Sequence, residues 1–363
     1  DQVELNVSGR YDHYSEGFSH FSPKVGVKFT PIKELAIRGT YAEGFRAPTF
    51  AESGPRSQYA GFVSTTPPCN FILQHGGTGT AASCSANGNP YNLNYNLGRG
   101  LAGNPNLQPE ISRSFTGGVI FQPVRWLSLT VDYYNVRKKN LIVTGPDFGK
   151  AVAAYYNSAN LAAAQTAVAG VGQGYSVNTT DAVDPLFPNA LPRVLIINVP
   201  YVNANYALTS GIDFSATATV PLGDGIKFTS RIEATHVIKY NLVTSAGVQH
   251  YAGTMGPYDL SSGNGTPSWR GNWQNTLDFG DYSLSATAFY VSRIKAVSED
   301  QGLPLDCANG NLYTRSSPQN EAFCYVSPFI NVDLNGTVKV NDKFTFCLLY
   351  TSDAADEGVC VVV

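Results

Sequence analysis

The sequence predicts an all-β protein, a partial transmembrane antiparallel up-and-down β-barrel of about eleven strands. Three observations support this fold class. Short segments alternate between apolar and polar side chains, the period of a pleated strand. Tight turns and long loops join these segments alternately, as the periplasmic turns and extracellular loops of outer-membrane barrels do. Only 14% of the residues are charged, against about a quarter in soluble domains.

The first predicted strands are 3–14, 25–30 and 35–42. A short loop through Gly17 and Pro23 separates the first two, and a tight turn at 31–34 precedes the third. The third strand stops at 44–48, where Gly44 permits unusual dihedral angles and Pro48 lacks a ladder donor. A long loop without clear periodicity then continues to Phe115, far beyond the usual length of a connection.

The remaining strands follow the same scheme of paired segments. Segments 115–122 and 127–134 precede a second long loop, from about 140 to 205, in which the Ala-rich piece 150–169 is compatible with a short helix. Segments 212–220 and 226–234 come next, followed by a loop over 241–267. The last strands are 269–279, 282–290, 332–338 and one that begins at Phe344, with a hairpin turn predicted at Gly280-Asp281.

The charged side chains fix which face meets lipid. In the opposite orientation, six cations would lie in hydrocarbon, at a cost of about 2–4 kcal/mol each near the midplane. These cations are Arg10, Lys28, Arg38, Lys227, Arg231 and Arg270. We therefore expect the charged faces to line the interior and the apolar faces to contact membrane lipid. A soluble β-sandwich lectin would instead have polar outward faces.

Two motifs carry a family resemblance. Tyr41–Thr49 reads YAEGFRAPT and Asn104–Glu110 reads NPNLQPE, in that order. Together they resemble the corresponding segments of TonB-dependent outer-membrane receptors, as do Arg10–Ser15 with Pro23–Val27 and Leu208–Asp213. The motif residues are interpreted as loop-to-strand hinges that do not touch a ligand. They are Gly44, Phe45, Arg46, Pro48, Asn104, Pro105, Pro109 and Glu110.

The resemblance implies that residues 1–346 are part of the β-barrel of such a receptor, about half of a barrel of about 22 strands with a plugged lumen. It implies TonB-energised uptake of a scarce nutrient, such as a ferric siderophore, across the outer membrane of a Gram-negative bacterium. The plug and the TonB box are absent from this sequence, so the TonB complex would be reached through a missing N-terminal region. Receptors for siderophores, cobalamin, haem and oligosaccharides share these motifs, and the substrate stays open.

The tail, 347–363, does not continue the alternation. From Cys347 to Glu357 it resembles the translated sequence of a transposase adapter used in sequencing libraries. We expect this tail to be non-native and the gene to be truncated at that point. No charged-then-apolar segment typical of a signal peptide opens the chain, which suggests a missing N-terminus.

Aromatic residues in the long loops are candidates for binding a small-molecule substrate, since tyrosines clamp ligands at low entropic cost. The alternative is that they pack the loops on one another or lie in the interfacial belt. The candidates are Tyr59, Phe62, Tyr91, Tyr95, Tyr155, Tyr156 and Tyr175.

Cysteines occur in close pairs within single loops. Cys69 and Cys84 share one loop, and Cys307 and Cys324 share another. Such pairs indicate local disulfides in an oxidising compartment, each stabilising by about 3 kcal/mol. The alternative, a zinc site, requires closer spacing. A third pair, Cys347 and Cys360, lies in the tail.

The sequence gives no indication of an enzyme, a cofactor, a metal site or a nucleic-acid partner. The five histidines lack the HExxH spacing, no nucleophile elbow occurs, and the net charge is −3. A glycine-rich segment, 77–82, neither follows a predicted strand nor opens a helix, as a dinucleotide loop would. The alternative to a receptor is a diffusion porin or an adhesin-like barrel without a plug.

Overall fold

The computed structural model describes residues 2–15, 17–54, 58–85, 90–145, 147–244, 247–255, 265–295, 325–341, 344–351 and 358–362. The chain divides into two compact units. The wall unit comprises Asp1–Phe45, Ile111–Leu141 and Ala204–Val363, and the loop unit comprises Arg46–Glu110 and Ile142–Asn203. Each is described by itself.

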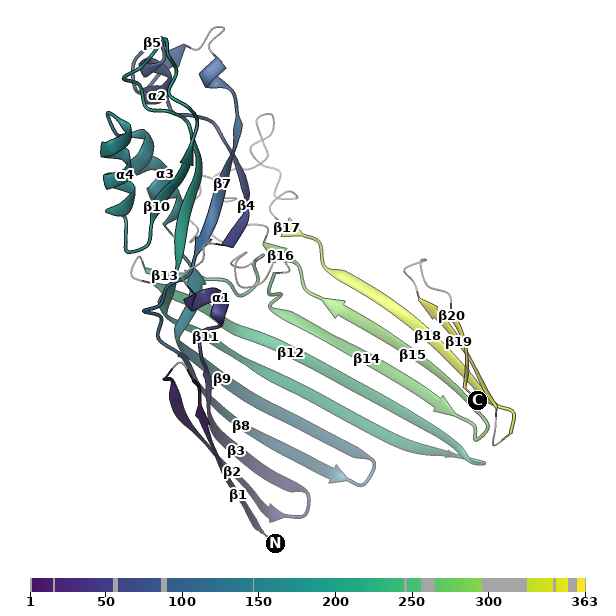
Figure 1. The fold of residues 1–363 in the computed structure, drawn as a ribbon. Helices are drawn as coiled ribbons and strands as arrows, with labels where there is room; N and C mark the ends of the chain where they lie inside the picture. The colour runs from purple at the N-terminus through teal and green to yellow at the C-terminus, as the bar shows by residue number, and fades with distance from the viewer. Residues whose placement is uncertain are drawn as a thin grey trace. The chain divides into compact units, whose positions relative to one another are not determined.

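The wall unit is an up-and-down antiparallel sheet in which each strand pairs with the next one along the wall (Figure 1). Its order is β1 (Val3–His13), β2 (Ser19–Ile32), β3 (Leu35–Arg46), β8 (Glu110–Val124), β9 (Leu127–Thr144), β11 (Val194–Gly223), β12 (Ile226–Thr244), β14 (Trp269–Asp278), β15 (Tyr282–Val291), β18 (Phe329–Lys339), β19 (Thr345–Thr351) and β20 (Gly358–Val362). The sheet does not close, because β1 and β20 each have one neighbour among the described strands. Each predicted strand has its counterpart here, so the predicted fold class is confirmed.

Several strand ends differ from the prediction. β2 begins at Ser19, so Pro23 lies inside a strand rather than in a loop. It is tolerated because Pro23 pairs with Gly9 of β1, whereas the ladder with β3 starts only at Lys24. At the other end of the chain, β19 continues to Thr351 and pairs with β18 beyond Cys347. That the tail, 347–363, is non-native stays a prediction.

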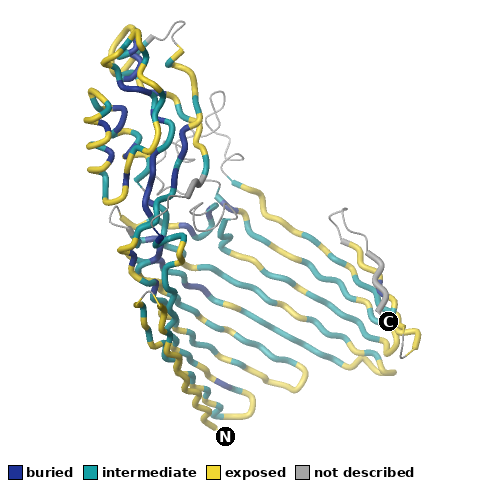
Figure 2. Tube along the Cα trace, viewed as in Figure 1, coloured by how far each residue is buried: buried dark blue, intermediate teal, exposed yellow. Residues whose placement is uncertain are grey.

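The two faces of the wall differ as the alternation predicts. Outward-facing apolar side chains are exposed, with Leu5 opposite Val27 and Val7 opposite Val25. The other face carries ion pairs, including Lys28 Nζ to Glu4 Oε1 at 2.9 Å. Figure 2 shows that few wall residues are buried. A wall that exposes its apolar face is suited to contact lipid rather than water.

Glycine at position 118 allows an ion pair to span a whole strand. The Arg38 guanidinium on β3 donates to Asp132 on β9, with Nε 2.8 Å from Oδ1, although β8 runs between them. Gly118 of β8 lies beneath this pair, and a Cβ there would be 1.9 Å from Asp132 Oδ1. Any side chain at this position would displace the carboxylate.

A pair of spin labels tests the assignment of the faces. A label at Leu129 is expected to be accessible to oxygen dissolved in the acyl chains, and a label at Thr130 to a water-soluble relaxation agent, because successive residues point to opposite faces. Electron paramagnetic resonance of the protein in liposomes measures both accessibilities. The reverse pattern would contradict the lipid-facing assignment.

Short elements border the wall. β13 (Gly247–His250) pairs with β12, and β16 (Ile294–Lys295) pairs with β17 (Tyr325–Val326). The hairpin predicted at Gly280-Asp281 is confirmed, since the Phe279 N–H donates to the Tyr282 carbonyl at 2.8 Å. Gly280 has φ +85°, which glycine adopts without strain. No helix in the described part of the chain is long and apolar enough to cross a membrane.

Apart from helix in the Ala-rich piece 150–169, the secondary structure of the loop unit is not predicted by the sequence pattern. Its elements are α1 (Phe50–Ser53), β4 (Gln58–Thr65), α2 (Cys69–Gln74), β5 (Thr78–Gly79), β6 (Cys84–Ser85), η1 (Pro90–Asn92), β7 (Tyr95–Ala102), α3 (Phe148–Tyr156), α4 (Leu161–Ala169) and β10 (Ser176–Thr180). β7 pairs antiparallel with β4 and parallel with the first part of β11, to which β10 adds on the other side. The long loops therefore form a small mixed sheet with helices.

The loop unit also has a hydrophobic core of its own. Figure 2 shows the buried residues concentrated along its strands and helices. Phe71 of α2, Leu97 of β7 and Ile197 of β11 are almost fully buried, as are Tyr155 of α3 and Val168 of α4. Because these residues come from both long loops, the two loops fold on a shared core.

Candidate functional site: the motif clasp and the aromatic core of the loops

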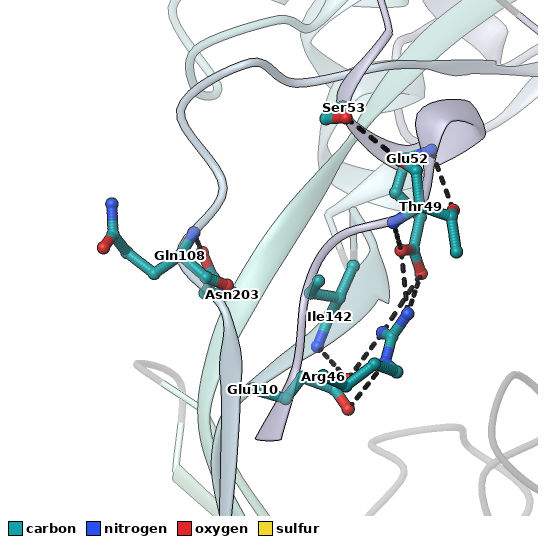
Figure 3. Close-up of polar contacts among 8 residues, drawn as sticks. All are labelled: Arg46, Thr49, Glu52, Ser53, Gln108, Glu110, Ile142 and Asn203. Carbon is teal, nitrogen blue, oxygen red and sulfur yellow. Dashed lines mark hydrogen bonds and ion pairs between the residues drawn. The ribbon is translucent and has the colours of Figure 1, made fainter. Parts of the chain in front are cut away.

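The two sequence motifs meet in the loop unit through one arginine (Figure 3). Arg46 forms a bidentate pair with Glu110, with Nε 2.9 Å from Oε2 and Nη2 2.8 Å from Oε1. The backbone N–H of Ile142 donates to the same Glu110 Oε1 at 2.9 Å. Arg46 also donates from Nη1 to Glu52 Oε2 at 2.9 Å. We call this group of Arg46, Glu52, Glu110 and the Ile142 N–H the motif clasp.

A capping box positions Glu52 in the clasp. The Thr49 N–H donates to Glu52 Oε2 at 2.7 Å, and the Glu52 N–H donates to Thr49 Oγ1 at 3.3 Å. This reciprocal pair starts α1 and turns the Glu52 carboxylate toward Arg46. The backbone carbonyl of Glu52 also accepts from the Asn104 N–H at 2.8 Å.

Amide side chains complete the connection to the second long loop. Asn104 Nδ2 donates to the Tyr201 carbonyl at 2.9 Å. Asn203 makes a reciprocal pair with the backbone of Gln108, accepting from its N–H at 2.8 Å and donating to its carbonyl at 2.8 Å. The clasp and these amides thus join both ends of the first long loop, 46–110, to the second long loop, 142–203.

The predicted motif residues take different places. Arg46, Asn104 and Glu110 make the contacts above, and the structure brings them together. Gly44 and Phe45 end the wall part of β3, where the Phe45 ring stacks on His20 at 5.0 Å. The three prolines, Pro48, Pro105 and Pro109, lie in the irregular segments between elements.

Sequence reasoning missed Glu52, Ile142 and Asn203. Only Glu52 had a readable signal, since Thr49-x-x-Glu52 is the pattern of a capping box. Ile142 contributes a backbone N–H, which no side-chain pattern reveals. Asn203 acts across 95 residues of sequence.

The clasp is held by opposite charges in a partly dry site. Glu110 is 7% exposed, and the hydrogen bonds that Arg46 donates to the Glu110 and Glu52 carboxylates raise the pKa of Arg46 above its ordinary value. Burial alone would raise the pKa of Glu52, but hydrogen bonds from Arg46 and the Thr49 backbone outweigh it and lower that pKa. Both groups are therefore charged at neutral pH, and the arrangement holds segments in place rather than performing chemistry.

Acid is expected to destabilise the loop unit by protonating Glu52. Because its folded pKa lies below its unfolded value, its stabilising contribution is complete above about pH 4.5 and declines as the pH falls through the folded value. We expect the protection factors for hydrogen exchange in the loop unit, which compare the exchange rate with that of an unfolded chain at the same pH, to fall below about pH 4. In Glu52→Gln the protection factors should be lower at pH 7 than in the unaltered protein, and they should fall less on acidification. An unchanged acid dependence in this variant would contradict the role of Glu52.

The candidate ligand-binding aromatics divide into two groups. Tyr155, Tyr156 and Tyr175 are at most 5% exposed and belong to the core of the loop unit. Their burial favours a packing role, the alternative that the sequence left open, and ligand contact by these three stays a prediction. The Tyr155 hydroxyl donates to the Pro192 carbonyl at 2.7 Å, and Tyr175 Oη accepts from the Asp147 N–H at 3.1 Å.

Of the other four candidates, Phe62, Tyr91 and Tyr95 lie nearer the surface of the loop unit. Phe62 on β4 is 65% exposed, and Tyr59 lies on the same strand, where its backbone pairs with Gly100. Tyr91 and Tyr95 pack against the core from its edge. Ligand contact by these residues stays a proposal.

Tyr91 and Tyr95 form part of an aromatic cluster with His75 and Arg193. The His75 and Tyr91 rings stack with centroids 3.9 Å apart, and the Arg193 guanidinium lies over Tyr91 at 5.6 Å and Tyr95 at 5.1 Å. The Tyr91 hydroxyl donates to Asp184. Burial raises the pKa of Tyr91 and of Tyr95 to about 12, so both hydroxyls are neutral at physiological pH.

A disulfide joins Cys69 to Cys84, across the segment that holds α2 and β6. Cys307 and Cys324 lie outside the described residues, and Cys347 is disulfide-bonded. The described residues contain no group of three or more His, Cys, Asp or Glu able to hold a metal ion.

The family model "TonB dependent receptor-like, beta-barrel" matches residues 1–350. The chain belongs to this family. In the motif clasp of this TonB-dependent receptor barrel, Arg46 and Glu110 come from the two segments that resemble the family in sequence, whereas Glu52 and Ile142 lie outside them. No curated protein matches the chain.

Solved receptors share the fold of this TonB-dependent receptor barrel. The ferric enterobactin receptor PfeA of Pseudomonas aeruginosa is 15% identical with a TM-score of 0.55, and the match covers 96% of this chain and 36% of that receptor. The siderophore receptor PirA of Acinetobacter baumannii is 14% identical with a TM-score of 0.54, over 96% of this chain and 39% of that receptor. The chain thus spans little more than a third of the length of these receptors.

Proposed function

We propose that the chain is the β-barrel part of an outer-membrane receptor that takes up a scarce nutrient, such as a ferric siderophore, with energy supplied through TonB. The match to the family over residues 1–350 is the observation that carries this proposal. The structural likeness to two siderophore receptors supports an iron chelate as the substrate class. One of the solved receptors is bound to enterobactin.

The loop unit suits the binding step of such a receptor. A ligand site gains affinity when its loops are ordered before the ligand arrives. Here the shared core, the disulfide between Cys69 and Cys84 and the motif clasp hold both long loops in one arrangement. The exposed Phe62 and the edge residues Tyr91 and Tyr95 are the candidate contacts for substrate.

Location and partners follow from the same proposal. The wall would lie in the outer membrane of a Gram-negative bacterium, with lipid on its apolar face. The TonB complex would act on a plug region outside this sequence.

Uptake by living cells tests the function. A strain that lacks the gene is expected to lose uptake of a radioiron-loaded siderophore under iron limitation, and the intact gene should restore it. Uptake should stop when a protonophore collapses the proton-motive force or when TonB is deleted. Uptake that persists after both treatments would overturn the TonB-energised proposal in favour of a diffusion porin.

The substrate class has its own control. A panel of catecholate and hydroxamate siderophores, haem, cobalamin and an oligosaccharide separates the classes. If only a substrate without iron depends on the gene, the iron-chelate part of the proposal fails while the TonB-energised part stands.

A further inference from the structure

The outward face of the wall unit changes from apolar to cationic toward the long-loop ends of β8 and β9. These strands are neighbours in the sheet (Figure 1). On β8 the exposed, outward Phe115 is followed on the same face by Arg113. On β9 the exposed Tyr133 is followed on that face by Arg137 and Lys139. All three cations are exposed.

The height of these cations matches the edge of the apolar band. From Leu127, where β9 begins, to Arg137 the strand extends about 33 Å at about 3.3 Å per residue. A tilt of about 40° reduces this to about 25 Å along the membrane normal, the height of the outward apolar band of such barrels. Trp126 is exposed at the short-turn end, as interfacial aromatics are. Arg137 and Lys139 therefore lie at headgroup level.

The cations are close together and incompletely neutralised by the protein. Arg113 and Arg137 are direct partners in the β8–β9 ladder, and like charges directly opposite each other are destabilising. Among the described residues one carboxylate contacts the group, Glu43, which accepts from Arg113 Nε at 2.9 Å. The Arg137 guanidinium lies 3.9 Å from the centroid of the Tyr206 ring, which fixes its plane. Three positive charges thus face one negative charge.

We propose that Arg113, Arg137 and Lys139 form a binding site for a phosphate-bearing lipid headgroup in the leaflet on the long-loop side. Two guanidinium groups and an ammonium match the oxygens of a phosphate, and arginine binds phosphate in bidentate fashion. A lipid supplies this phosphate at the height of the cations, with its acyl chains along Phe115 and Tyr133. The inference rests on the membrane placement in the proposed function, but not on transport or on TonB.

Lipid binding to the whole receptor tests the site. The receptor is placed in nanodiscs of phosphatidylcholine that contain a few per cent of bisphosphorylated lipid A, and retained lipid is measured by native mass spectrometry. We expect phosphorylated lipid A to be retained at least tenfold over dephosphorylated lipid A. The variant Arg137→Gln with Lys139→Gln should lose most of this preference.

Lys138 provides a matched control, because it is the strand neighbour of Lys139 and points to the opposite face, where it lines a cavity of about 290 Å³. Lys138→Gln should retain the lipid like the unaltered receptor, whereas Lys139→Gln should retain several times less. Equal losses in the two variants, or equal retention of the two lipids, would overturn the site. Failure to enter the nanodisc would overturn the membrane placement itself, whereas loss of uptake in cells would not affect this result.

Discussion

Replacement of Tyr155 by alanine is expected to destabilise the loop unit by about 3–5 kcal/mol, the usual cost of truncating a fully buried aromatic side chain. Tyr155 has no exposed surface and contacts the ring of Tyr156 edge-on, with centroids 5.3 Å apart. Tyr155→Phe should cost less, because it keeps the buried ring. The remaining cost of about 1–2 kcal/mol arises because the Pro192 carbonyl loses its hydrogen-bond donor. Hydrogen exchange of the loop unit, with the wall amides as internal reference, measures both values.

Phe62→Ala provides the contrast for this prediction. Because Phe62 is 65% exposed, its truncation should leave exchange in the loop unit almost unchanged. If Phe62 contacts substrate, the same variant should weaken siderophore binding. Tyr155→Ala with normal protection would contradict the packing role of Tyr155.

Arg46→Ala is expected to destabilise the loop unit by about 3 kcal/mol. Removal of one partner from a buried ion pair typically costs about 3–5 kcal/mol, because the other charge stays desolvated. Here two carboxylates lose their partner, with side chains 9% exposed in Glu110 and 16% in Glu52. The Arg46 side chain is itself 41% exposed, so water screens part of the interaction and places the effect at the lower end of the range. Arg46→Lys should rescue little, because an ammonium cannot bind both carboxylates in bidentate fashion.

A double-mutant cycle isolates the pair at the centre of the clasp. Arg46→Ala, Glu110→Ala and the double variant should show a coupling energy above about 1 kcal/mol, since the two residues share two hydrogen bonds. Additive effects would contradict the clasp. Arg38→Ala serves as a control in the wall unit, because it removes an ion pair of similar geometry without touching the loop unit.

The wall was predictable because the two faces of its strands differ, one apolar and the other polar. This difference imposes a period of two on residues such as Leu127 to Tyr133, and the short turns carry recognisable glycine and proline. Strand ends were less accurate. Pro23 predicts a loop, although the strand accommodates this residue where the ladder with β3 is absent.

The loop unit was not predictable in this way, because its order comes from contacts between distant segments. β7 pairs with β4 on one edge and with β11 on the other, and both partner strands lie far from it in the sequence. The single helix predicted over 150–169 is two helices, and Asn160 starts the second by accepting from the Ala163 N–H at 2.9 Å. Arg46 and Glu110 are 64 residues apart, and no local pattern pairs charges over that distance.

The parallel pairing of β7 with the first part of β11 has a consequence for engineering and for divergence. Ile197 of the second long loop aligns with Arg99 of the first, and both loops contribute side chains to one small core, most of them from the second. If either loop is shortened, swapped or grafted alone, core side chains of the other lose their packing partners. Chimeras between receptors should therefore exchange 46–110 and 142–203 together, as a single cassette.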